Sequence, residues 1–391
     1  MRRFVFFLAL IGLLSFHPGA GAYDESKPSV VWSVMADGIG DLTFASEEWV
    51  TEANRVLTDA VARHSANLKG LGTFTLCEVA HNPPAYLHVD GALAWHAKFD
   101  GASVTVASGE LPASECDLKI QGDHSIISNL ARIQYHGNNP EVVAAAQARL
   151  KKLSRWEIDG KMTDHKPLRA ILRHLHDEMA GPTMPRFLWM TPEWVEIARR
   201  MVSDRAAMSV YDDGLRDVDF IFAESFGGGP AYAFPEGEAG GFWIKVNYGE
   251  ITVGSGLLPK ALEPADLLST GLYLPILNVG RTVNAAMNEA DLKSQEEYRA
   301  KAFEPDPSLK KPIHSGYNSP SGRGPMPKGM SLVMSVLHDE LSKRTSGELP
   351  SDYYDDIPEK WGKPMAFDRS ESYDKSWVLY DQFTIYGDPI K

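Results

Sequence analysis

The sequence has few cysteines, a deficit of basic residues and, after its first 22 residues, no apolar run long enough to span a membrane. The two cysteines lack the short spacing of zinc ligands, and we expect neither a metal nor a cofactor. Lys and Arg number 39 against 52 Asp and Glu, and the net charge is −13. That charge disfavours nucleic acid and anionic lipid surfaces as partners, because both attract clustered cations. A P-loop and a G-x-S-x-G nucleophile elbow are also missing.

The first 22 residues have the pattern of an export signal. Arg2 and Arg3 are followed by the apolar stretch Phe4–Phe16 and by Ala20-Gly21-Ala22, an A-x-A cleavage site. The apolar stretch is too short to cross a bilayer comfortably. We therefore expect a mature protein that is periplasmic or secreted and has no transmembrane anchor.

The second half of the chain repeats the first. The offset between matching residues only grows, from 145 (193 − 48) to 162 (338 − 176), as a tandem duplication with small insertions requires. Chance matches would scatter instead. Three of the matched pairs are Glu48-Trp49-Val50 with Glu193-Trp194-Val195, Pro84-Ala85-Tyr86 with Pro230-Ala231-Tyr232, and Leu175-His176-Asp177-Glu178 with Leu337-His338-Asp339-Glu340.

Each repeat has the pattern of a helix, a meander of about five short strands, and further helices. Ser46 and Thr191 are predicted N-caps, and apolar residues follow each at helical spacing. This order predicts an α+β fold of two tandem units, each a mostly antiparallel sheet covered by helices on one face. The predicted segments are a signal peptide (1–22), an extended leader (23–42), a first repeat (43–182), a second repeat (188–345) with a loop insertion at 305–327, and an aromatic, acidic C-terminal tail (346–391).

Both cysteines fall in the first repeat. Export permits a disulfide between Cys77 and Cys116, and two small buried hydrophobic residues are the equal alternative. The second repeat has Ala223 in place of Cys77, so a bridge is not essential to the fold.

The order of elements resembles the sterol-carrier-protein type 2 lipid-binding family. The resemblance rests on the strand pair ending at Asp100-Gly101, on Asp117–Gly122 followed by a helix, and on the stretch from Trp156-Glu157-Ile158-Asp159-Gly160 to Glu178. The second repeat has no clean counterpart of Trp156–Gly160. The resemblance implies a hydrophobic tunnel between sheet and helices that holds a sterol, fatty acid or other lipid for carriage or transfer, and it implies no catalytic residue.

The candidate ligand-binding residues lie on one sheet face and on the helix behind it. Alternation places the sheet residues on a common side, where they form either a ligand wall or ordinary core. The two arginines either meet a ligand carboxylate or phosphate, or pair within each repeat with the matched Glu78 and Glu224. The candidates are Trp95, Ala97, Phe99, Ile127 and Arg132 in the first repeat, and Phe242, Ile244, Val246, Ile276 and Arg281 in the second.

Two other functions remain open. An enzyme could use the duplicated His176-Asp177-Glu178 and His338-Asp339-Glu340 for acid–base chemistry, although consecutive helix residues point in different directions. A scaffold protein could dock a partner through the C-terminal tail. Apolar cavity walls would favour binding, converging polar groups would favour an enzyme, and a filled core would favour a scaffold.

Overall fold

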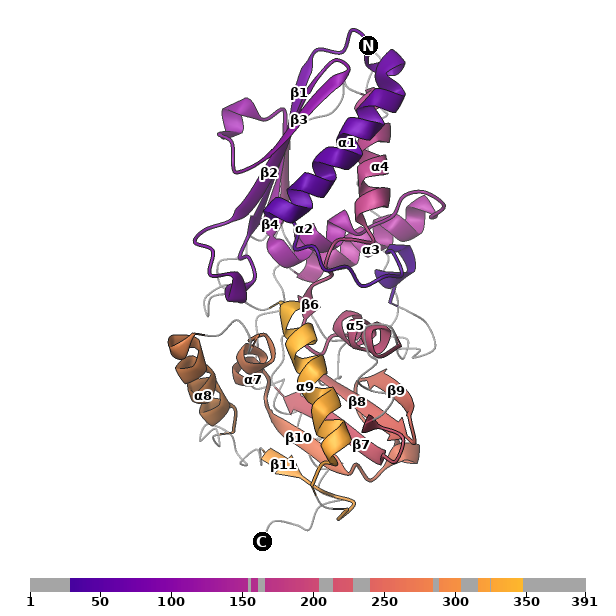
Figure 1. The fold of residues 1–391 in the computed structure, drawn as a ribbon, viewed down its shortest axis with the longest axis vertical. Helices are drawn as coiled ribbons and strands as arrows, with labels where there is room; N and C mark the ends of the chain where they lie inside the picture. Colours follow the sequence, from indigo (N-terminus) through magenta and orange to yellow (C-terminus); the bar gives the residue numbers. More distant parts are fainter. Residues whose placement is uncertain are drawn as a thin grey trace, which may run out of the picture.

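The computed structural model describes residues 29–153, 156–160, 166–203, 214–227, 240–283, 288–303, 316–323 and 325–346. The predicted signal peptide, the first part of the predicted leader, about half of the predicted insertion loop and nearly all of the predicted tail lie outside these residues. Within them the chain is a mixed α+β protein whose two large sheets follow one another along the long axis (Figure 1). No helix in the described part combines the length and the apolar character needed to cross a bilayer.

The first unit is a five-stranded sheet of order β3-β2-β1-β4-β5. β1 and β4 are parallel, and every other neighbouring pair is antiparallel. The helices α1 and α4 lie side by side against this sheet (Figure 1). The elements are α1 (Glu47–Leu68), β1 (Thr73–His81), β2 (Leu93–Asp100), β3 (Ser103–Ser108), β4 (Leu118–Asp123), α2 (His124–Ala131), α3 (Pro140–Leu153), β5 (Trp156–Gly160) and α4 (Lys166–Met179).

The second unit has the same topology. Its sheet has the order β9-β8-β7-β10-β11, again with one parallel pair, β7 and β10. A two-stranded parallel sheet of β6 and β12 joins its two ends. The elements are β6 (Phe187–Leu188), α5 (Pro192–Ser203), β7 (Asp219–Gly227), β8 (Gly240–Asn247), β9 (Glu250–Ser255), β10 (Leu267–Leu272), α7 (Tyr273–Gly280), α8 (Glu289–Phe303), β11 (Gly316–Asn318), α9 (Lys328–Lys343) and β12 (Thr345–Ser346).

Two expectations from the sequence need correction. The strands do not form a simple meander, because the fourth strand of each unit crosses over to lie parallel to the first. The segment 305–327 is not only a loop, because β11 lies within it and takes the edge position that β5 takes in the first sheet. Local alternation identifies a strand but does not select its neighbour, and a strand of three residues is too short to show alternation.

Each unit opens with the same local structure. Ser46 accepts a hydrogen bond from the backbone N–H of Trp49 at 3.3 Å, and Thr191 accepts one from that of Trp194 at 3.3 Å. The residue before each cap, Ala45 or Met190, has a left-handed φ of 60° or 59°. The two predicted N-caps are therefore confirmed, and each follows a sharp turn into the helix.

In each unit, a tryptophan of the first helix donates the same hydrogen bond to a threonine that follows the last helix. The indole Nε1 of Trp49 in α1 donates to Thr183 Oγ1 at 2.8 Å, just after α4. The indole of Trp194 in α5 donates to Thr345 Oγ1 at 2.9 Å, just after α9. The repeat in the sequence thus corresponds to a repeat of buried side-chain contacts.

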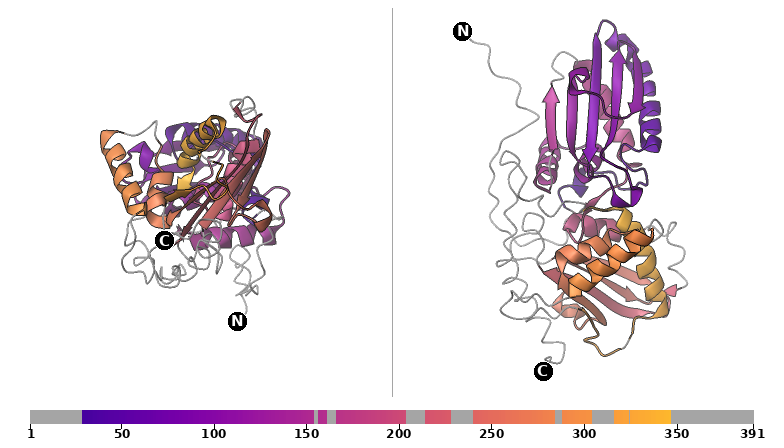
Figure 2. Two further views of the ribbon diagram at one scale, coloured as in Figure 1. Left: turned by 90° about the horizontal axis from the view of Figure 1, so that it is seen from below. Right: turned by 90° about the vertical axis from the view of Figure 1, so that its left-hand side faces the viewer.

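The hydrophobic cores are built on the sheet faces that the helices cover, which we call the inner faces. In the first unit, α1 and α4 pack onto the inner face through residues such as Leu57, Ile171 and Leu175. A second core joins the units, because it includes Trp32 of the leader and Leu150 of α3 together with the inner face of the second sheet. Figure 2 shows the strands of the first sheet from its other, outer side.

A disulfide joins β1 to the connection between β3 and β4. Cys77 lies on the outer face of β1, and Cys116 precedes β4. Beside the disulfide, Asp117 Oδ2 accepts a hydrogen bond from the backbone N–H of Thr75 at 2.8 Å. The equivalent Asp266 accepts one from Ile221 at 2.8 Å, so the second unit holds its crossover without a disulfide.

The disulfide should stabilise the first unit by limiting its unfolded chain. The bridged residues are 39 apart, a loop for which the chain-entropy relation gives about 3–4 kcal/mol. We expect the double variant Cys77→Ala/Cys116→Ala to lose about that much free energy of unfolding in urea titrations. Reductant should lower the stability of the wild type and leave the variant unchanged; equal sensitivity in both would contradict the assignment.

Candidate functional site

The predicted ligand face of the first unit lies in the hydrophobic core. Trp95, Ala97 and Phe99 are 1%, 0% and 1% exposed, and Ile127 of α2 is 2% exposed. The ring of Trp49 in α1 lies 5.2 Å from that of Trp95. These side chains therefore contact the protein's own helices.

The matching residues of the second unit also face the helices. Phe242, Ile244, Val246 and Ile276 belong to the core shared by the two units. The ring of Phe242 lies 5.4 Å from that of Trp194 in α5. The alternation predicted from the sequence thus identified the inner face in both sheets.

The first predicted arginine has a different role from either expectation. Arg132 is fully buried at the end of α2, and Glu78 is not among its hydrogen-bond partners. Burial, together with the nearby charges of Arg200 and Arg344, lowers the pKa of Arg132 to about 9. Its guanidinium donates to the main-chain carbonyls of Ala36, Gly38, Gly181 and Thr183.

The second predicted arginine contacts an asparagine at the end of the preceding helix. Arg281 Nε donates to Asn278 Oδ1 at 2.9 Å, one turn earlier at the end of α7. The expected pair of Glu224 with Arg281 is absent among the described contacts, as is that of Glu78 with Arg132. Each arginine ends a helix, while each glutamate lies on a strand, and sequence spacing could not show that they point to different places.

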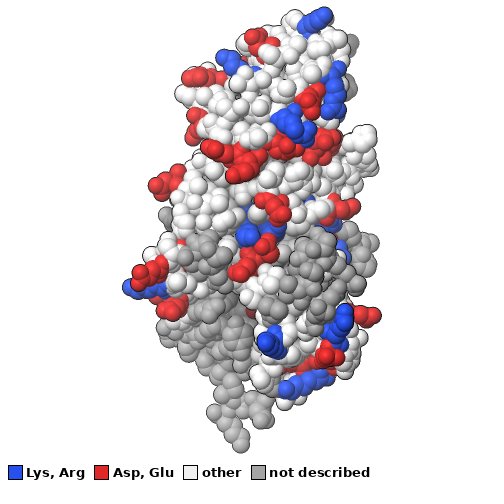
Figure 3. All heavy atoms as spheres, in the orientation of Figure 1, with Lys and Arg blue, Asp and Glu red and all other residues white. Residues whose placement is uncertain are grey.

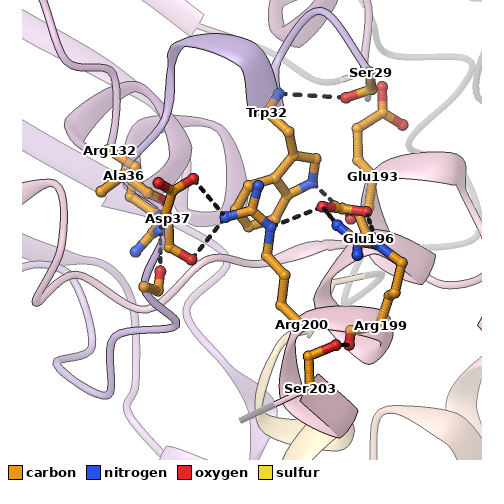
Figure 4. Close-up of polar contacts among 11 residues, drawn as sticks. Ser29, Trp32, Ala36, Asp37, Arg132, Glu193, Glu196, Arg199, Arg200 and Ser203 are labelled. Atoms are coloured by element: carbon orange, nitrogen blue, oxygen red, sulfur yellow. Dashed lines mark hydrogen bonds and ion pairs between the residues drawn. The ribbon is translucent and has the colours of Figure 1, made fainter. Parts of the chain in front are cut away.

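Around Arg132, the leader is fixed across the junction of the two units (Figure 4). The ring of Trp32 lies between two guanidinium groups, with the Cζ atoms of Arg200 and Arg132 at 4.4 and 5.7 Å from its centroid. Its indole Nε1 donates to the carbonyl of Glu193 at 2.9 Å. Arg200 Nε also donates to Glu196 Oε1 at 2.8 Å, so the guanidinium that lies over Trp32 is held by an ion pair as well.

The matched glutamates lie on the inner faces of the two sheets. Glu78 is 9% exposed and accepts a hydrogen bond from the indole of Trp95, directly opposite on β2, at 2.9 Å. Burial raises its pKa to about 7, although the bond from Trp95 acts to lower it. A buried carboxyl of this kind holds its proton near neutral pH.

Glu224 lacks the partner that Glu78 has. Phe242 stands opposite it where the first unit has Trp95, and a phenyl ring has no N–H to donate. Ser269 lies beside Glu224 on the parallel strand β10, and its hydroxyl is buried without a hydrogen bond. Glu224 itself is partly exposed, and burial raises its pKa to about 8. A buried, unpaired hydroxyl therefore lies beside a carboxyl of raised pKa on this inner face.

Sequence analysis identified both glutamates but missed Ser269. The strand registers align Ser269 with Glu224 and Ile120 with Glu78, so serine in the second unit replaces isoleucine in the first. The replacement of isoleucine by serine on an inner face was the feature of the sequence that could have pointed to this position. It could be recognised only once the register of a parallel pair was known.

The duplicated His-Asp-Glu segment does not form a common site. His176 is buried, and burial lowers its pKa to about 4, so it is neutral at pH 7. Asp177 Oδ1 accepts hydrogen bonds from the backbone N–H groups of Tyr135 and His136 at 2.6 and 3.1 Å. In the second unit, Glu340 pairs with its helix neighbour Lys343 at 2.8 Å. The contact of Asp177 holds the segment after α2, and that of Glu340 lies within the last turns of α9.

A hollow of about 460 Å³ lies beside β4 and β5 in the first unit. Lys119 and Gln121 of β4 line it together with their register partners on β5, Asp159 and Glu157. Trp156, the first residue of β5, forms another wall. Both polar and apolar residues line the hollow, and the sequence analysis did not predict it.

Charge on the surface is mixed in sign. Figure 3 shows acidic side chains gathered in a band across the first unit, with basic side chains interspersed above and below it. The described residues contain no group of three or more His, Cys, Asp and Glu side chains that could hold a metal ion.

Comparison with known proteins gives no relative. No protein-family model, curated protein or solved structure matches this chain. The sterol-carrier resemblance therefore stays a prediction, and the function must be argued from the described residues.

The buried glutamates should make stability depend on pH. The unfolded state releases each proton near pH 4.5, whereas folded Glu224 keeps its proton to about pH 8 and Glu78 to about pH 7. Between these limits the folded state binds more protons, so the free energy of unfolding falls as pH rises, by at most about 1.4 kcal/mol per unit for each group.

Urea unfolding at pH 5, 6, 7, 8 and 9 would measure this dependence. We expect Glu224→Gln to remove the decrease between pH 7 and 8 and to reduce the slope below pH 7. The matched variant Glu78→Gln should reduce only the slope below pH 7. Identical pH profiles for the wild type and both variants would rule out the protonated state of these carboxyls.

Proposed function

We propose that this chain is a two-unit binding protein that holds an apolar ligand without covalent chemistry on the inner face of its second sheet. The observation that carries the proposal is the buried, unpaired hydroxyl of Ser269 beside Glu224, among the rings of Phe222, Phe226 and Phe242. Binding sites for small molecules combine apolar walls with a few polar groups that orient the ligand.

The comparison between the units supports a division of roles. In the first unit, Glu78 is bonded to Trp95, and Ile120 fills the position of Ser269. That inner face satisfies its own polar group and needs no ligand. We therefore assign binding to the second unit and a structural role to the first, which holds the second through the shared core.

The energetics favour a ligand with both apolar and polar parts. A buried polar group without a hydrogen bond costs about 1–3 kcal/mol, which a ligand hydroxyl or carbonyl would recover. Burial of an acyl chain contributes about 0.8 kcal/mol per methylene. Ten buried methylenes then reach roughly 8 kcal/mol, close to micromolar affinity.

The partial exposure of Glu224 supports access to this position from solvent. The sterol-carrier resemblance favours a sterol, fatty acid or other lipid as the ligand. The predicted export signal would place its carriage in the periplasm or outside the cell. Enzyme chemistry has less support, because the side chains of His176, Asp177 and Glu178 face different partners.

Titration with a fluorescent fatty acid and a fluorescent sterol tests the proposal. We expect saturable, micromolar binding by the wild type. Ser269→Ile, which introduces the first unit's residue, should weaken binding at least tenfold because it adds bulk beside Glu224 and removes the hydroxyl. The matched control Ile120→Ser should bind as the wild type does.

Thermal unfolding would show that the variants remain folded, and Ser269→Ala removes the hydroxyl without adding bulk. Absence of saturable binding to every lipid class tried would refute a lipid-binding function. Equal affinity for wild type and Ser269→Ile would refute this location.

A further inference from the structure

Two polar side chains on the inner face of the second sheet indicate which kind of head group a ligand there would have. Glu224 on β7 and Ser269 on β10 are direct neighbours in the parallel register, so their side chains leave the same face side by side. Ser269 is 1% exposed, and its hydroxyl has no hydrogen-bond partner. A hydroxyl can both donate and accept a hydrogen bond.

The first unit shows what its matching glutamate accepts. Trp95 stands directly opposite Glu78 on β2, and its indole Nε1, an uncharged donor, lies 2.9 Å from Glu78 Oε2. In the second unit the opposite residue is Phe242, whose ring has no N–H. The hydrogen bond that a side chain supplies in the first unit can therefore come from an uncharged donor on a ligand in the second.

Apart from Glu224, the described side chains on this inner face are uncharged. Lys245 alternates with Ile244 and Val246 along β8, so it projects from the outer face. Lys328 is exposed at the start of α9. Other basic side chains of the covering helices α5 and α9 have acidic partners, namely Arg199 and Arg200 with Glu196, Lys343 and Arg344 with Glu340, and His338 with Asp339.

A ligand carboxylate would therefore bring a negative charge to a face without a counter-ion among the described residues. Burial already raises the pKa of Glu224 to about 8, the direction expected where the surroundings disfavour a negative charge. A fatty acid could enter only after taking up a proton, and at pH 7 fewer than about one molecule in a hundred of an ordinary carboxylic acid is protonated. A ligand hydroxyl brings no charge and meets no such cost.

We propose, on the basis of lipid binding by the second unit, that the ligand is a lipid alcohol whose hydroxyl lies between Glu224 and Ser269. One hydroxyl donates to the carboxyl of Glu224 and accepts from Ser269, so a single group serves both side chains. Sterols and long-chain alcohols share this chemistry. An ester or ether head only accepts, so it cannot supply the donor that Trp95 supplies in the first unit.

Isothermal titration calorimetry at pH 7 with the full mature chain tests the proposal. The probes 1-dodecanol, methyl dodecanoate and dodecanoic acid have the same acyl length and differ only in the head group. Cholesterol and its 3-methyl ether, presented from cyclodextrin, form the sterol pair. We expect saturable binding of at least one alcohol, about fivefold weaker binding of its capped derivative, and binding of dodecanoic acid about tenfold weaker than that of dodecanol.

Matched variants locate the head group. Glu224→Gln keeps the size of the side chain and removes the acid, so it should reduce the preference for dodecanol over dodecanoic acid about threefold. Glu78→Gln, the same change in the first unit, should leave that preference unchanged. Phe242→Trp introduces the first unit's donor and should bring the affinities for the alcohol and its capped derivative close together, which gives a second measurement if Glu224→Gln fails to fold.

The outcomes separate this inference from lipid binding itself. If no probe saturates, lipid binding by the second unit is refuted and the inference with it. If the acid or the capped derivatives bind at least as tightly as the alcohols, lipid binding stands and the lipid-alcohol assignment is overturned. The assignment is also overturned if the folded Glu224→Gln and Phe242→Trp variants keep the head-group preference of the wild type.

Discussion

The buried guanidinium of Arg132 is the constraint on which the arrangement of the two units depends. A charge without access to water must be satisfied by hydrogen bonds, and here the acceptors are main-chain carbonyls of the leader and of the link after α4. The leader can supply them only by crossing the junction, where Trp32 joins the shared core. Thr183 of the same link accepts a hydrogen bond from the indole of Trp49. The contacts that close the first unit and those that attach it to the second therefore share this residue.

The duplicated fold has kept its framework and changed the two strand neighbours of a matched glutamate. A glutamate remains in the middle of the first strand in both sheets, with a raised pKa in both. In the first unit Trp95 satisfies it, and in the second Phe242 cannot. Ser269 adds a buried, unpaired hydroxyl beside it. A buried polar group without a partner is costly for the free protein, which is why this difference, more than the shared apolar walls, supports binding by the second unit.

Much of the framework could be predicted from residues near one another in the chain. The N-caps Ser46 and Thr191 act on residues three positions later, and the alternation of Trp95, Ala97 and Phe99 assigned a strand face correctly. The Glu–Arg pairs were predicted wrongly, because both members were known to be repeated but not where their side chains pointed. β11 was missed because its three residues are too few to show a period.

The sequence by itself determined the duplication, the order of elements and the inner face of each sheet, because repetition and periodicity are local properties of a chain. Only the tertiary structure decided which groups meet. It closed the disulfide that the sequence left open, gave Arg132 acceptors as far as 96 positions away, and left the hydroxyl of Ser269 unpaired beside Glu224. Contacts of this kind depend on the crossover of β4 and the path of the leader, which packing selects and no local pattern encodes.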